Sequence, residues 1–165
     1  MTPADIKDLV ASHIPMAATL RLQVDEVSSS RVRLLLPPNP ALNNHTGTLH
    51  AGAQTTAAET AAIALGFAVL EHVEVTCQSK SIGLRFRKPA RAELWACAQL
   101  PPETTDGLEA RLTAEGKVEL AILVELAGAA GERLADVDSA EAQIVETTEV
   151  AQQQHAHRTQ PVDHA

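Results

Sequence analysis

One carboxylate with catalytic potential interrupts an apolar, alanine-rich stretch. Glu59 lies in the middle of residues 51–70, which are almost all small or apolar and are predicted to form a buried helix. An unpaired buried charge costs several kcal/mol. The small residues around Glu59 leave room for a ligand or a water molecule beside a general base. The alternative is a structural ion pair with Arg85 or Arg87.

Polar residues gather just before this helix begins. Asn44 and His50 lie in the preceding loop, and Ala51 and Gly52 form the first turn. Free backbone N–H groups and the positive end of the helix dipole converge there, an arrangement that stabilises a developing oxyanion. Taken singly, Asn44 is equally explained as a turn residue and His50 as a group that caps or orders the loop.

The register of these residues with the acid forms a pattern. Asn44, His50 and the Ala51-Gly52 pair are followed by Glu59 seven positions after the glycine, and the four residues ending at His50 read GTLH. The pattern resembles the active-site motif of the phenylacetic-acid-type acyl-CoA thioesterases of the hotdog-fold superfamily. Ala51 stands where that family has a glycine and Glu59 where it usually has Asp. The chain therefore resembles an uncharacterised branch with HAG…E in place of HGG…D.

The resemblance implies hydrolysis of an acyl-CoA-type thioester to a free acid and a thiol. The Ala51 N–H would polarise the thioester carbonyl, and Glu59 would activate water or attack directly. Ser79, followed after nine residues by a Pro-Ala pair as in the family's third strand, would orient the water. Asn44 and His50 would position the thioester and its leaving sulfur. CoA enters as part of the substrate, and no separate cofactor is implied.

The family precedent also implies a site shared between subunits, with Glu59 facing the motif loop of a neighbour. A homo-oligomer, either a dimer or a dimer of dimers, is independently expected because only 2% of the residues are aromatic, so a core of small side chains needs additional burial. The competing hypothesis is a hotdog protein that binds an acyl thioester, or serves as a scaffold, without catalysis.

Basic residues cluster after Ser79 in a chain that is otherwise acidic. Arg85, Arg87, Lys88 and Arg91 are candidates for binding CoA phosphates, although a solvated strand face explains any one of them. If the alternating apolar residues of this strand face the core, its period of two places Ser79 with the arginines on the opposite face.

The remaining pattern predicts the frame that positions these residues. An amphipathic helix is expected over residues 4–13 and a loop rich in Pro, Asn and Gly over 37–48. Strands are expected over residues 19–27, 31–36, 78–88, 92–100, 117–126 and 133–145, while 103–116 is ambiguous. This order contains no βαβ alternation. It predicts an α+β hotdog fold, in which an antiparallel sheet wraps around one long helix.

The length and the net charge of the chain limit the number of domains and the classes of binding partner. The 165 residues fit one domain over residues 1–146 with a polar, flexible tail over 147–165. The net charge of -8 disfavours nucleic acid as a partner. Cys77 and Cys97 lack the spacing of a metal site or a disulfide framework, and no long apolar run predicts a membrane span. A cytoplasmic protein with no bound metal is expected.

Overall fold

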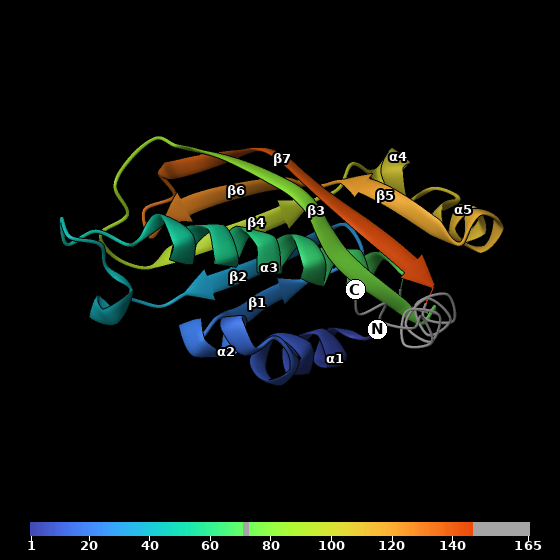
Figure 1. Ribbon diagram of the computed structural model, residues 1–165, viewed down its shortest axis with the longest axis horizontal. Helices are drawn as coiled ribbons and strands as arrows, with labels where there is room; N and C mark the ends of the chain where they lie inside the picture. Colours follow the sequence, from blue (N-terminus) through green and yellow to red (C-terminus); the bar gives the residue numbers. More distant parts are fainter. Residues whose placement is uncertain (71–72, 147–165) are drawn as a thin grey trace, which may run out of the picture.

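Seven strands form one antiparallel sheet around a long helix. The computed structural model describes residues 1–70 and 73–146, so the predicted tail lies outside the described residues. The strand order is β1-β2-β4-β6-β7-β3, and β5 also pairs with β7. The strands are β1 Gln23–Val27, β2 Arg31–Leu36, β3 Val75–Phe86, β4 Leu94–Gln99, β5 Lys117–Ala121, β6 Leu123–Gly128 and β7 Arg133–Glu146. Figure 1 shows the sheet curling around the helix α3, as the α+β prediction requires.

The region predicted as one strand over residues 117–126 is two strands. β5 pairs with the C-terminal half of β7, and β6 pairs with the N-terminal part of β7 and with β4. Between them, the N–H of Ile122 donates to the carbonyl of Ala140 at 2.7 Å. The uninterrupted apolar alternation conceals this break, because β5 and β6 lie along the same edge of β7. The ambiguous segment before β5 forms two helices, α4 Pro102–Thr105 and α5 Leu108–Glu115.

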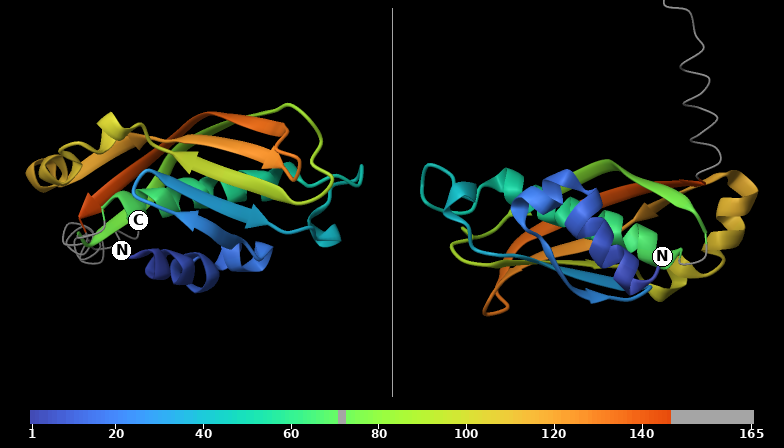
Figure 2. Two further views of the ribbon diagram at one scale, coloured as in Figure 1. Left: turned by 180° about the vertical axis from the view of Figure 1, so that it is seen from behind. Right: turned by 90° about the horizontal axis from the view of Figure 1, so that it is seen from below.

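The N-terminal segment covers one end of the strand series. The helix α1, Pro3–Asp8, begins at a capping box between Thr2 and Asp5 and continues as a π-helical turn over Leu9–His13. A second helix, α2 Pro15–Leu20, was not predicted: it begins at a proline and ends at Arg21, whose φ is 58°. The first strand therefore begins at Gln23 and not at Thr19. Both helices lie beside α3 (Figure 2).

The helix α3, Ala51–Val69, is the core of the molecule. It packs against β2, β3, β4, β6 and β7, and most of its alanines are buried. A helix that is apolar on nearly every side has to be enclosed, and the curled sheet encloses it. The loop before α3 contains only a short 3-10 turn, Pro40–Leu42, as its Pro and Asn content predicts.

The helix α3 approaches β3 closely at Gly66. A Cβ atom at this position would lie 2.5 Å from the Sγ of Cys77 on β3. Burial raises the pKa of the Cys77 thiol to about 12, so this side chain packs as a small neutral group. The contact sets the distance between helix and strand.

We expect Gly66→Ala to destabilise the protein by about 1–3 kcal/mol, because the added methyl overpacks the contact with Cys77. In a Cys77→Ala background the same substitution should stabilise, since alanine is the better helix former by about 1 kcal/mol. Urea unfolding of the four proteins of this cycle measures both effects. Equal effects of Gly66→Ala in the two backgrounds would show that the contact does not limit the packing.

Candidate functional site

The loop before α3 is organised by the side chain of Asn44. Its Oδ1 accepts hydrogen bonds from the backbone N–H groups of Thr46 at 2.9 Å and Thr48 at 3.2 Å, and its Nδ2 donates to Thr48 Oγ1 at 2.9 Å. Gly47 completes the turn with a φ of +74°. The structure therefore gives Asn44 the turn role that the sequence left open, and its amide shapes the loop.

His50 is the N-cap of α3. Its Nδ1 accepts a hydrogen bond from the Gly52 N–H at 2.9 Å, which satisfies one of the unpaired donors of the first turn. This bond requires the neutral ring to carry its proton on Nε2, and the side chain is exposed. A Cβ at Gly52 would lie 3.1 Å from Nδ1, so the glycine leaves room for the cap. His50 therefore caps the helix, which is one of the two roles considered for it from the sequence. Its Nε2–H remains available as a donor.

The first residue of α3 presents a free backbone donor. Ala51 is exposed, and among the described residues its N–H has no hydrogen-bond acceptor, whereas that of Gly52 is occupied by His50. The N–H of Ala51 projects at the positive end of a 19-residue helix. Because Ala51 is exposed, this N–H is available to a ligand oxygen.

A cavity of about 330 Å³ opens at this terminus. The motif loop and the end of β3 form its walls, and the hydrogen bond from Leu49 N to Ala90 O, at 2.8 Å, joins the two segments. The cavity is lined by Asn44, Thr48, Leu49, Ala51, Gln54, Phe86, Arg87, Lys88 and Pro89. The structure thus brings Asn44 and Ala51 together with two of the predicted basic residues.

Gln54 is a site residue that the sequence analysis did not select. It is only 5% exposed, and its Nε2 donates to the Leu49 carbonyl at 3.0 Å. Its Oε1 is buried without a hydrogen-bond partner. The sequence feature that could have identified Gln54 is its amide side chain in a mostly apolar helix. The acid Glu59, in the same helix, was selected instead because a carboxylate can act as a base.

Glu59 is half-buried and lies outside this cavity. In the described part of the chain its carboxylate has no hydrogen bond or ion pair, and Arg87 is instead paired with Asp136, with 2.7 Å between Nε and Oδ2. That pairing removes support for the structural ion pair. Eight residues along α3 correspond to about 12 Å, so one chain does not bring Glu59 to the N–H of Ala51.

Ser79 does not share a face with the arginines, contrary to the simple alternation. A β-bulge at Lys80 shifts the register, so that Ser79 pairs with the buried Ala142 while Ser81 pairs with Glu141. Directly paired residues of antiparallel strands point to the same side, so Ser79 faces the α3 side, two residues beyond Cys77. Its side chain is exposed and does not line the cavity.

The four predicted phosphate-binding residues differ in position. Arg87 and Lys88 line the cavity, and Arg91 is exposed on the loop that follows. Arg85 lies on β3 opposite Asp136, whose carboxyl pKa is lowered by the hydrogen bond from Arg87. Lys88 has no ion-pair partner among the residues that the structure describes. The basic residues therefore lie at the same end of the molecule as the first turn of α3.

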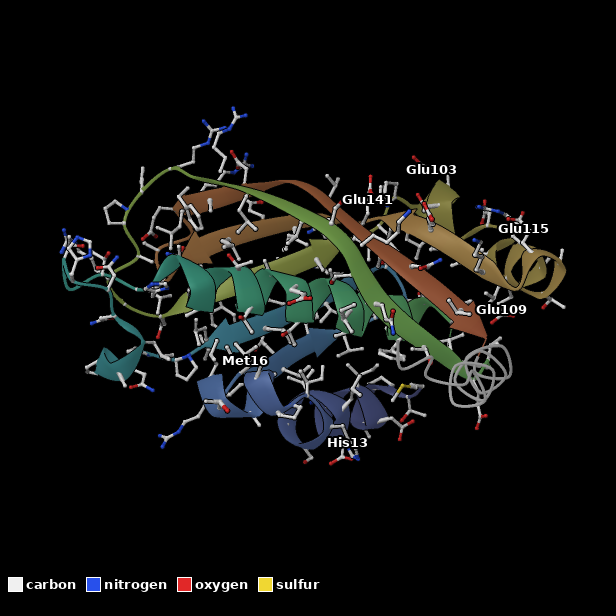
Figure 3. The ribbon with its side chains drawn as sticks, in the orientation of Figure 1. His13, Met16, Glu103, Glu109, Glu115 and Glu141 are labelled. Atoms are coloured by element: carbon white, nitrogen blue, oxygen red, sulfur yellow. The ribbon has the colours of Figure 1, made fainter. Side chains whose placement is uncertain are left out.

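Acidic side chains lie at the other end. Glu103, Glu109 and Glu115, labelled in Figure 3, surround α4 and α5, away from the first turn of α3. Within residues 1–70 and 73–146, no group of three His, Cys, Asp or Glu side chains is placed to hold a metal ion. No helix in those ranges is long and apolar enough to span a membrane.

The chain is similar in sequence to one protein family and in structure to several solved proteins. A family model described as "Domain of unknown function (DUF4442)" matches residues 3–145. No curated protein matches the chain. A Pseudomonas aeruginosa protein described as of unknown function and "Probable Thioesterase" is 27% identical, with a TM-score of 0.74 over 88% of this chain and 96% of its own.

Two further solved structures support the fold at lower identity. A thioesterase from Haemophilus influenzae is 15% identical, with a TM-score of 0.69 over 88% of this chain and 92% of its own. A thioesterase family protein from Silicibacter pomeroyi is 21% identical, with a TM-score of 0.66 over 87% and 98% of the two chains. The predicted hotdog fold is confirmed.

Proposed function

This chain belongs to the DUF4442 family, and from its site we propose that it hydrolyses an acyl-CoA-type thioester. Water adds to the thioester carbonyl, the C–S bond breaks, and the products are a carboxylic acid and the protonated thiol. The likeness to the Pseudomonas aeruginosa protein described as a probable thioesterase supports this reaction class. CoA is part of the substrate, and the chain's own groups supply the chemistry.

The unpaired N–H of Ala51 carries the proposal. It lies at the N-terminus of α3 and opens into the cavity, where a thioester carbonyl oxygen would accept its hydrogen bond. As water adds, that oxygen gains negative charge, which the N–H and the helix dipole stabilise more strongly than the neutral carbonyl. We assign to the Nε2–H of His50 the role of a hydrogen-bond donor to the leaving sulfur.

The acid for this reaction comes from a second copy of the chain. Glu59 is about 12 Å along the helix from Ala51 of its own chain, too far to share one water molecule with it. In a dimer with the α3 helices side by side, each Glu59 faces the other chain's motif loop, takes the proton of the attacking water and returns it to the leaving thiolate. Ser79, on the α3 side of β3, orients that water.

A half-buried apolar surface supports this association. On α3, Ile63 and Phe67 continue the line of Glu59 at helical spacing and are only partly covered. Phe86 at the end of β3 is 45% exposed. Burying these groups against an equivalent surface would add apolar contact to a core of small side chains. We propose a homodimer, alone or as half of a dimer of dimers.

The CoA moiety is expected to lie along the basic rim of the cavity. Lys88 and Arg91 are exposed there, and their cationic groups fit the phosphates of the nucleotide. Arg87 and Arg85 extend the positive surface along β3, with Arg87 partly neutralised by Asp136. The end of the molecule formed by α4 and α5 is acidic and would repel phosphate. The basic rim is therefore the more favourable binding site for an anion.

A non-catalytic acyl-thioester-binding protein is the second candidate. The methyl group of Ala51 stands where a glycine is usual in the resembled motif, and it narrows the approach to the N–H. A protein of this kind would use the same cavity and rim but would not position a water molecule on the carbonyl.

We expect Glu59→Gln to abolish thioester hydrolysis while leaving ligand binding intact, because the amide cannot accept the proton of the attacking water. The assay is release of free CoA thiol from short, aryl and long acyl-CoAs. Glu115→Gln, at the distant α5 end, is the matched control and should retain wild-type rates. If wild type and Glu59→Gln share the same background rate on every substrate, the non-catalytic candidate is correct.

Ala51→Pro should lower kcat by about 10²–10³, since proline removes the backbone N–H that contacts the oxyanion. Proline fits the first position of a helix, and the extended ψ of 139° at His50 suits a residue before proline, so the fold is retained. Ala51→Gly keeps the N–H and serves as the control, with activity equal to or above wild type. An Ala51→Pro protein with unchanged circular dichroism and full activity would exclude this N–H from the reaction.

A further inference from the structure

Two buried polar side chains line the cavity. Within the described residues, Thr48, Gln54 and Thr60 are the buried polar side chains, and the first two are among the lining residues. The other lining residues include exposed ones, namely Ala51, Phe86, Arg87, Lys88 and Pro89. A ligand in the cavity would therefore lie against both exposed and buried polar residues.

Gln54 supplies an acceptor that the protein itself does not use. Its Nε2 donates to the Leu49 carbonyl at 3.0 Å, and this bond fixes the amide orientation, because the reversed amide would set two carbonyl oxygens against each other. Oε1 is consequently the free atom, and it has no hydrogen-bond partner. A buried acceptor without a donor is costly, so a bound ligand that carries a donor would be favoured there.

The position of Gln54 relates this acceptor to the reacting carbonyl. Gln54 is three residues after Ala51, on the same side of α3, and helical side chains lean towards the N-terminus. The bond to Leu49, which precedes the cap, places the amide beside the first turn. Because Ala51 and Gln54 both belong to the first turn of α3 and both line the cavity, we assign the carbonyl on the Ala51 N–H and the donor on Gln54 Oε1 to one short acyl group, as in a 3-hydroxyacyl thioester.

We infer that the preferred acyl group is short and carries a hydroxyl near the thioester carbonyl, with Gln54 as the residue that determines this specificity. The inference rests on the proposed function and names its substrate class. A volume of about 330 Å³ is at the lower end of the range for small-ligand pockets, about 300–1,000 Å³. A plain alkyl chain would leave Oε1 desolvated and unpaired.

The test compares 3-hydroxybutyryl-CoA with butyryl-CoA. For wild type we expect kcat/KM to be at least about tenfold higher for the hydroxyacyl substrate, since one buried hydrogen bond is gained. Gln54→Met retains the length of the side chain but not the acceptor, and should bring the ratio of the two kcat/KM values close to one, whatever its effect on the absolute rates. Thr60→Val, which removes a buried hydroxyl outside the cavity, should keep the wild-type ratio.

Binding separates this inference from the proposed hydrolysis. Isothermal titration with the two non-hydrolysable thioether analogues should show the same preference in wild type and its loss in Gln54→Met. Preferential binding without hydrolysis would contradict the proposed function and support the role of Gln54. A wild-type ratio close to one in both assays would overturn the inference without any variant, as would a preference that persists in folded Gln54→Met.

Discussion

The enclosure of α3 is the constraint on which the rest of the structure depends. A helix that is apolar on almost every side must be covered, and the sheet curls around it, with Gly66 allowing the close approach to Cys77. This packing fixes where the first turn of α3 emerges. The motif loop and the end of β3 meet at that point through Leu49 and Ala90. The cavity and its free Ala51 N–H are therefore consequences of how the helix is buried.

Local pattern was sufficient to predict most of the frame and some of the site. Alternation located most of the strands, and the motif pattern selected Asn44 and Ala51, which line the cavity. Three features of the structure could not be predicted from local sequence pattern. The bulge at Lys80 turns Ser79 to the α3 side, the break at Ile122 divides one predicted strand, and the free Oε1 of Gln54 depends on where the Leu49 carbonyl lies. Each arises from backbone hydrogen bonding between distant segments, which side-chain periodicity does not encode.

The site residues divide into two groups with different physical roles. The side chains of Asn44 and His50 form hydrogen bonds within the loop and the helix cap, so they order the first turn of α3. Glu59 is left with an unpaired carboxylate about 12 Å away along the helix. The proposed dimer accounts for both observations, because one chain would supply the preorganised helix terminus and the other the carboxylate. Catalysis would then require association through the half-buried apolar surface beside Glu59.

Complementation between two inactive proteins tests the shared site most directly. Ala51→Pro and Glu59→Gln are mixed in equal amounts, unfolded and refolded together, and assayed for thiol release, with native mass spectrometry to confirm mixed dimers. Each mixed dimer contains one site with an intact Ala51 N–H and an intact Glu59, so activity should return to about one quarter of the wild-type value. Mixed dimers that form but remain inactive would contradict a site built from two chains.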